Sequence, residues 1–121
     1  SEKTFIEVSK YIKNSKFLNL KCLSVHIGSQ ILDHKPYEKM LKVLEKVIKK
    51  TNFRFDYIDL GGGMGIDYDN SKKFLNLKKY SLSIQKFLKR HDSKIIYEPG
   101  ISIITTQGIF ISKIIYLKEC Y

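Results

Sequence analysis

The middle of the chain reads Tyr57-Ile58-Asp59-Leu60-Gly61-Gly62-Gly63-Met64-Gly65. A short apolar run here ends abruptly in three consecutive glycines. This pattern is typical of a buried strand followed by a loop whose backbone N–H groups can surround an anion, most often a phosphate. By themselves the glycines fit better a tight turn that packs a helix against a sheet. The segments on either side therefore decide the interpretation.

Strand and helix patterns alternate around the glycines. Strands are expected at residues 20–27, 55–60 and 93–97, and helices at residues 5–12, 35–50 and 72–90. Strands that alternate with helices of about 15 residues are typical of βαβ units and a parallel sheet. Each expected strand ends in a short polar or glycine-rich motif, and α/β folds bind their ligands at that edge of the sheet. The order predicts an α/β fold with about three βα units, too few to close a (β/α)8 barrel.

Two of the expected helices carry an apolar stripe at helical spacing. In the helix expected at residues 35–50 the stripe consists of Tyr37, Met40, Leu41, Leu44, Val47 and Ile48. In the helix expected at residues 72–90 it consists of Leu77, Tyr80, Ile84, Phe87 and Leu88. Residues 101–117 are rich in β-branched side chains, which favours a long strand after a short helical or irregular stretch at residues 101–107.

The chain of 121 residues is strongly basic, with a formal net charge of +10. Only Arg54 and Arg90 among its 22 basic side chains are arginines, and the lysines are spread along the chain among acidic residues. Arginine is the residue that best forms bidentate contacts with phosphates and bases. Solvated helix faces therefore explain the charge better than nucleic-acid binding does. A basic nucleic-acid-binding module is the weaker alternative.

Cys22 and Cys120 match no metal-binding or redox spacing, so two free thiols in a reducing, cytoplasmic compartment are expected and no metal site is predicted. No apolar run approaches the ~20 residues of a membrane span. We therefore expect a cytoplasmic protein without membrane or nucleic-acid partners.

The first strand ends in Val25-His26-Ile27-Gly28-Ser29-Gln30. A lone histidine after a strand is more often structural than catalytic. Here a glycine and a hydroxyl donor follow it at once. An imidazole in this place can lie flat against an aromatic ring, and Ser29 can donate a hydrogen bond to a cofactor or its phosphate.

The third strand ends in Tyr97-Glu98-Pro99-Gly100. A carboxylate at the end of a buried strand needs a partner. One suitable partner is a protonated pyridine nitrogen, which a carboxylate keeps cationic so that the ring can accept electrons. The competing interpretation, about as strong for this motif alone, is a Glu that caps or forms an ion pair within a Pro-Gly turn.

A different class of enzyme also uses such a glycine loop. Asp59-Leu60-Gly61-Gly62-Gly63 resembles the first motif of adenosylmethionine-dependent methyltransferases, in which a helix follows directly and the next strand ends in an acidic residue. Residues 67–70 delay the helix here, although the next strand does end at Glu98. A methyltransferase-like fragment is therefore the alternative.

The three motifs together, in this order, resemble the pyridoxal-phosphate-dependent decarboxylases of the ornithine, diaminopimelate and arginine family, which have an alanine-racemase-like barrel. Gly28-Ser29-Gln30 fits the diaminopimelate branch better than the ornithine branch. The resemblance covers nearly the whole chain. It implies a carbon–carbon lyase that releases carbon dioxide from meso-diaminopimelate to give L-lysine, a homodimer with shared active sites, and pyridoxal 5'-phosphate as the cofactor.

The resemblance also implies a role for individual residues. His26 would stack on the pyridine ring and Glu98 would pair with its nitrogen. The residues assigned to the cofactor, chiefly to its phosphate, are Ser29, Gly61, Gly62, Gly63, Gly100 and Ile101.

The sequence departs from the family in two ways. Ile101 stands where the family has an arginine, and an aliphatic side chain offers no charged fork to a phosphate or carboxylate. The family's Schiff-base lysine, on its first barrel strand, and its cysteine have no counterpart here. No catalytic residue is therefore assigned, and the chain alone is expected to be inactive.

These departures predict a fragment of the enzyme. Residues 1–108 would be the C-terminal part of a (β/α)8 barrel of the TIM type. Residues 109–121 would be the first strand of a C-terminal β domain, truncated at Cys120 and Tyr121.

Overall fold

The computed structural model describes residues 2–119 and shows helices alternating with parallel strands. The elements are α1 (Glu2–Lys13), β1 (Cys22–Ser24), α2 (Lys35–Thr51), β2 (Tyr57–Asp59), α3 (Leu77–Leu88), β3 (Lys94–Ile96), α4 (Ile101–Ile104) and the 3-10 turn η1 (Thr105–Gln107). The strands form one sheet in the order β1-β2-β3, and both neighbouring pairs are parallel. The prediction of an α/β fold with a parallel sheet is confirmed, although each strand is shorter than its pattern suggested.

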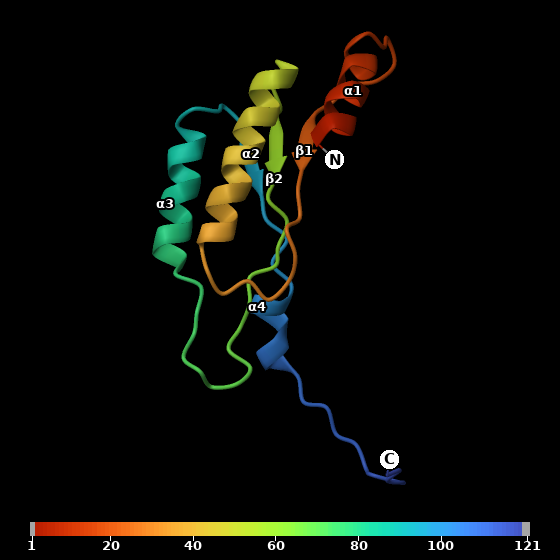
Figure 1. The fold of residues 1–121 in the computed structure, drawn as a ribbon, viewed down its shortest axis with the longest axis vertical. Coiled ribbons are helices and arrows are strands. Elements are labelled where there is room, and N and C mark those ends of the chain that lie inside the picture. The colour runs from red at the N-terminus through yellow and green to blue at the C-terminus, as the bar shows by residue number, and fades with distance from the viewer. Residues whose placement is uncertain (1, 120–121) are drawn as a thin grey trace.

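Helices α2 and α3 lie side by side over one face of the sheet (Figure 1). Leu23 and Ile58 are partners in the register, and their side chains are buried among those of the two helices. Five members of the predicted α2 stripe are buried, Tyr37, Met40, Leu41, Leu44 and Val47, as are three of the α3 stripe, Tyr80, Ile84 and Phe87. The apolar periodicity therefore predicted the helix faces that form the core.

Helix α1 packs against α2, as the contact of Phe5 with the core shows. Glu2 accepts hydrogen bonds from Lys46 (3.2 Å) and Lys50 (2.8 Å), which join the start of α1 to the last turns of α2. These ion pairs lie at the solvent surface.

The predicted start of the third long helix is wrong. The helix begins at Leu77 rather than at Lys72, because the Asn76 side chain accepts a hydrogen bond from the Lys79 amide (2.9 Å) and so caps the first turn. Leu77 was assigned to the buried stripe, yet it is 63% exposed because it lies in the first turn.

The chain after β3 is partly as predicted. The short helical stretch at residues 101–107 is confirmed as α4 and η1. The long strand expected after it is wrong for residues 108–119, which have no regular secondary structure and extend away from the body (Figure 1). A strand needs a neighbour to hydrogen-bond with, and Ile109, Phe110 and Ile115 are each at least 90% exposed. The last part of that prediction, residues 120 and 121, lies outside the described residues.

Candidate functional site

The segments that follow the three strands meet at one edge of the sheet. Because the strands are parallel and adjacent, their carboxyl ends lie together, with the glycine loop after β2 between the other two segments. The long loops and α4 gather at this end of the molecule (Figure 1). The structure thus brings together the three motifs that the sequence singled out.

His26 and Glu98 lie on the sheet face opposite to α2 and α3. Val25 and Ile27 pack against the core, so His26 between them points to the other side. Tyr97 contacts the ring of Tyr80 on α3, so Glu98 also points away from the helices. The register pairs Ser24 with Asp59 and Asp59 with Ile96. Beyond these pairs the Glu98 amide donates to the Gly61 carbonyl, and a Cβ on Gly61 would lie 2.9 Å from Nδ1 of His26. His26 and Glu98 therefore flank the glycine loop.

The glycine loop fits closely between its neighbours. The Glu98 amide donates to the Gly61 carbonyl (2.9 Å), and the Ile31 amide donates to the Gly63 carbonyl (2.8 Å). A Cβ on Gly62 would lie 2.2 Å from the Glu98 carbonyl oxygen. Gly63 has a φ of +84°, and a Cβ there would lie 2.0 Å from the Gly28 carbonyl oxygen. Glycine is therefore required here for protein packing, whether or not a ligand binds.

The amide groups of the three glycines differ in what they contact. The Gly61 N–H donates to Oδ1 of Asp59 (2.8 Å), and the Gly62 N–H donates to Nδ1 of His26 (3.4 Å). The Gly63 N–H has no hydrogen-bond partner within residues 2–119. Of the three amides that the sequence assigned to an anion, the structure thus leaves one available without rearrangement.

Asp59 is a residue of this site that sequence reasoning missed. Its side chain is on the same face as His26, is only 9% exposed, and accepts from the Ser24 hydroxyl (2.9 Å) as well as from the Gly61 amide. Both carboxylate oxygens are thus engaged in holding the start of the loop. The signal was available, since Asp59 alternates with the apolar Ile58 and Leu60 along the strand.

Three tyrosines lie behind the glycine loop on the helix side. The Tyr37 hydroxyl donates to the Gly62 carbonyl (3.2 Å), and the ring of Tyr80 meets that of Tyr37 edge-on at 4.7 Å and lies 6.4 Å from that of Tyr97. Burial raises the pKa of all three phenols, most strongly that of Tyr80. The neighbouring Tyr97 and Tyr37 raise the pKa of Tyr80 further. The sequence predicted Tyr37 and Tyr80 as core residues, and nothing in it indicated the contact with the loop.

Several polar groups at this edge have no partner within the described part of the chain. They are the Glu98 carboxylate, the Ser29 hydroxyl, Nε2 of His26 and the Gly63 amide. Ser29 follows Gly28, whose carbonyl lies against Gly63. The edge therefore offers two donors for an anion, an imidazole face and a carboxylate that can pair with a cation.

Gly100 and Ile101 lie at the start of α4, immediately after the Glu98 segment. A Cβ on Gly100 would meet no atom within 4 Å. Ile101 is half-buried and brings no charge to this position.

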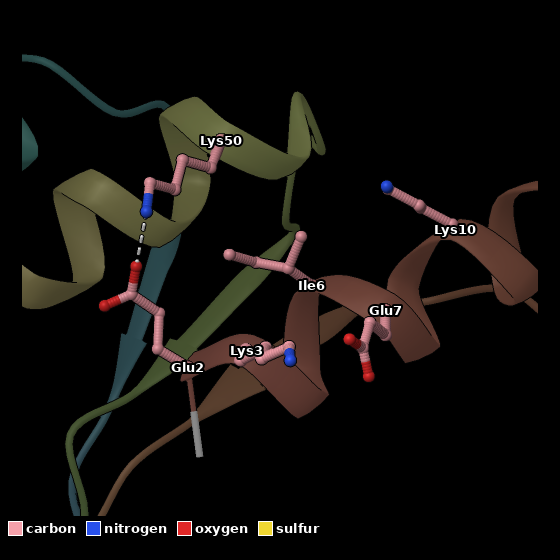
Figure 2. Close-up of a pocket in the computed structure, with 6 residues that line it drawn as sticks. All are labelled: Glu2, Lys3, Ile6, Glu7, Lys10 and Lys50. Carbon is pink, nitrogen blue, oxygen red and sulfur yellow. Dashed lines mark hydrogen bonds and ion pairs between the residues drawn. The ribbon is translucent and has the colours of Figure 1, made fainter.

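A surface hollow between α1 and α2 is not a competing site. Figure 2 shows that Glu2, Lys3, Ile6, Glu7, Lys10 and Lys50 line it. It lies where α2 ends, which Figure 1 shows at the other end of the sheet from the glycine loop. Two of its charged side chains, Glu2 and Lys50, already pair with each other (2.8 Å), and the unpartnered buried side-chain atoms of the described residues, on Glu45 and Tyr80, are not in its lining.

Comparison with known proteins finds relatives over most of the chain. Residues 3–105 match the family described as pyridoxal-dependent decarboxylase, pyridoxal binding domain. The diaminopimelate decarboxylase of Aquifex aeolicus is 37% identical over 116 residues, covering 91% of this chain and 27% of the relative. That of Helicobacter pylori is 33% identical over 121 residues, covering 98% of this chain and 30% of the relative.

Solved structures show the same likeness. Diaminopimelate decarboxylase from Helicobacter pylori, complexed with L-lysine, superimposes with a TM-score of 0.68 at 33% identity, over 83% of this chain and 26% of the other. The lysine/ornithine decarboxylase from Vibrio vulnificus, complexed with cadaverine, has a TM-score of 0.66 at 20% identity, which supports the fold alone. The chain spans under a third of the length of each of these relatives.

Proposed function

The chain belongs to the family of pyridoxal-dependent decarboxylases, and from this we propose that it forms the cofactor-binding edge of an enzyme that converts meso-diaminopimelate to L-lysine and carbon dioxide. The observation that carries the proposal is that the His26 imidazole and the Glu98 carboxylate, which has no partner within residues 2–119, flank the glycine loop. Family membership also removes the reason for the methyltransferase alternative, which depended on the glycine motif after β2 and on the acidic residue, Glu98, after the next strand.

We propose that the sheet is part of a (β/α)8 barrel of the TIM type. The parallel order β1-β2-β3, with α2 and α3 on one face, supports this. The opposite face is the one that a closed barrel turns inward, and the side chains of His26 and Glu98 lie on it. Residues 1–108 would belong to the barrel, and residues 109–121 would begin a β domain.

The residues present fit pyridoxal 5'-phosphate, because this edge has a group without a partner in residues 2–119 for each part of that molecule. Ser29 and the Gly63 amide would bind the phosphate, with Gly61, Gly62, Gly100 and Ile101 forming the adjoining backbone. The Glu98 carboxylate would hold the proton at the ring nitrogen, and the His26 imidazole would lie against the ring. When bound, the cofactor withdraws electrons from the substrate carbon that loses carbon dioxide.

This chain by itself is expected to bind without turnover. Ile101 offers no charge to the phosphate, which leaves neutral donors to hold it. A homodimer with shared active sites and a cytoplasmic location remain part of the proposal. The free thiol of Cys22 is consistent with a reducing compartment.

Binding of pyridoxine 5'-phosphate tests the proposal. This alcohol analogue has no aldehyde and therefore cannot react with the many surface lysines. In a two-dimensional amide NMR titration we expect shifts at Gly63 and in the His26 and Glu98 segments, with weaker binding in His26→Ala and Glu98→Ala. No shift at this edge, or shifts only around the hollow in Figure 2, would refute the proposal.

Adenosylmethionine is the matched control ligand. Binding of adenosylmethionine that Glu98→Ala abolishes and His26→Ala leaves unchanged would support a methyltransferase instead. Binding to duplex or single-stranded nucleic acid with a steep salt dependence would support the nucleic-acid alternative.

A further inference from the structure

Tyr37 is the side chain that contacts the glycine loop from the helix side. Its side chain is fully buried (0% exposed), and its hydroxyl donates to the carbonyl of Gly62, itself a buried residue. No other hydrogen bond reaches that carbonyl within residues 2–119. The Tyr37 hydroxyl therefore determines where the Gly62 carbonyl points.

The carbonyl of Gly62 and the amide of Gly63 belong to one peptide unit. All described peptide bonds are trans, and in a trans peptide the C=O and N–H bonds point in opposite directions. Because the carbonyl points towards α2, the Gly63 N–H points away from α2. This is the side of the sheet edge on which His26 and Glu98 lie.

Among the three consecutive glycines, the Gly63 amide is also the one without an acceptor in residues 2–119. Asp59 and His26 accept from the other two. A flip of the Gly62–Gly63 peptide would turn the Gly63 amide towards the helices and present a carbonyl oxygen in its place. A carbonyl oxygen repels an anion, so the orientation of this one peptide decides whether the loop attracts or repels a phosphate.

We infer that Tyr37 is a positioning residue for phosphate recognition: its hydroxyl holds the Gly62–Gly63 peptide so that the Gly63 amide faces the ligand. The inference rests on the proposed function and deepens it. Tyr37 touches no ligand and acts only through the peptide. Its ring fills the core, which phenylalanine does equally well, so the hydroxyl alone carries this role.

Tyr80 provides a matched control. It is nearly as buried as Tyr37 (5% exposed) and its ring contacts that of Tyr37, yet its hydroxyl has no partner within the described residues. Tyr37→Phe and Tyr80→Phe therefore remove the same atom from the same layer of the core, and only the first change releases the loop.

The experiment compares pyridoxine 5'-phosphate with pyridoxine, which has the same ring without the phosphate. Dissociation constants for both are measured by calorimetry or NMR on the parent chain, Tyr37→Phe and Tyr80→Phe. We expect the parent and Tyr80→Phe to prefer the phosphorylated ligand and Tyr37→Phe to lose about tenfold of that preference, as expected when one charge-assisted hydrogen bond is lost. Binding of pyridoxine itself should stay unchanged in all three.

A second readout needs no ligand. The residual dipolar coupling of the Gly63 N–H reports the direction of that bond, and we expect Tyr37→Phe to change it and Tyr80→Phe to leave it as in the parent chain. The inference is overturned if Tyr37→Phe keeps the phosphate preference, or if it weakens binding of both ligands equally, as general loosening would.

The two proposals fail in different ways. If the parent chain binds neither ligand, the proposed function is wrong and the inference falls with it. If the parent chain binds the phosphorylated ligand and Tyr37→Phe binds it as well, only the inference is wrong.

Discussion

Replacing Tyr80 with phenylalanine should stabilise this protein, although the substitution removes a polar group from the middle of the core. The Tyr80 side chain is 5% exposed and its hydroxyl has no hydrogen-bond partner in residues 2–119. Burying an unpaired hydroxyl costs about 1–3 kcal/mol in proteins. Removing one oxygen leaves little empty space, so we expect a net gain of about 1 kcal/mol in the free energy of unfolding.

The same change at Tyr37 should have the opposite sign. There the hydroxyl donates to the Gly62 carbonyl, so Tyr37→Phe leaves a buried acceptor without a partner. We expect this to lower the free energy of unfolding by about 1–3 kcal/mol. Two chemically identical substitutions, on rings 4.7 Å apart, thus differ only in hydrogen bonding.

Urea unfolding followed by circular dichroism measures both effects. With a urea dependence of about 1–3 kcal/mol per molar, a change of 1 kcal/mol moves the midpoint by roughly 0.3–1 M. The midpoint should rise in Tyr80→Phe and fall in Tyr37→Phe. If Tyr80→Phe lowers the midpoint as much as Tyr37→Phe does, the Tyr80 hydroxyl has a partner and the reasoning is refuted.

The pH dependence gives an independent check on Tyr80. Burial raises its pKa above the ordinary value of 10.0. Above pH 10.0 the unfolded chain therefore loses a proton that the folded chain keeps, and the free energy of unfolding falls as the pH rises. Tyr80→Phe should make that alkaline decline shallower, and an unchanged decline would contradict the assignment.

Three further predictions concern the loop and the helix surface. Gly62→Ala places a Cβ 2.2 Å from a backbone carbonyl oxygen and should lower the free energy of unfolding in urea by about 1–3 kcal/mol. In Gly100→Ala the added Cβ meets no atom within 4 Å, so this control should be neutral or stabilising. Similar urea midpoints for the two variants would contradict this packing. Hydrogen bonds from two lysines lower the pKa of Glu2 below 4.5. Its contribution to stability is therefore present above pH 4.5 and is lost as the pH falls through the lowered pKa. The reasoning is contradicted if the thermal midpoints of Glu2→Gln and the parent still differ at acid pH. Asp59→Ala should speed hydrogen exchange of the Gly61 amide, whereas Asp59→Asn, which keeps an acceptor oxygen, should not. Equal exchange rates in the two variants would show that Asp59 does not hold the loop.

Much of the fold was predictable from local patterns. The spacing of Tyr37 and Leu41 predicted the buried face of α2, because residues four apart lie on the same side of a helix. The start of α3 was missed even though its signal is local, since Asn76 is a favourable helix cap. The strand expected after residue 108 could not be judged from sequence, because its formation depends on a neighbour that β-branched composition does not specify.

In the candidate site, too, some residues could be identified from the sequence and others only from the structure. His26, the glycine loop and Glu98 were identifiable because each follows an apolar run, and adjacent parallel strands bring their carboxyl ends to one edge. The roles of Asp59 and Tyr37 were not identified, since both depend on hydrogen bonds between segments distant in sequence or on the orientation of a single peptide.

By itself, then, the sequence determined the α/β order, the helix faces and the three motifs, because periodicity and chain-turning residues act over a few neighbouring positions. Only the tertiary structure decided what the glycines do. Gly61 and Gly62 are held by protein groups on both sides, and of the three glycines Gly63 alone has an amide without a partner in the part of the chain that the structure describes. The reason is physical: a backbone N–H binds whichever acceptor lies nearest in space, and the distance between strand ends is set by the sheet.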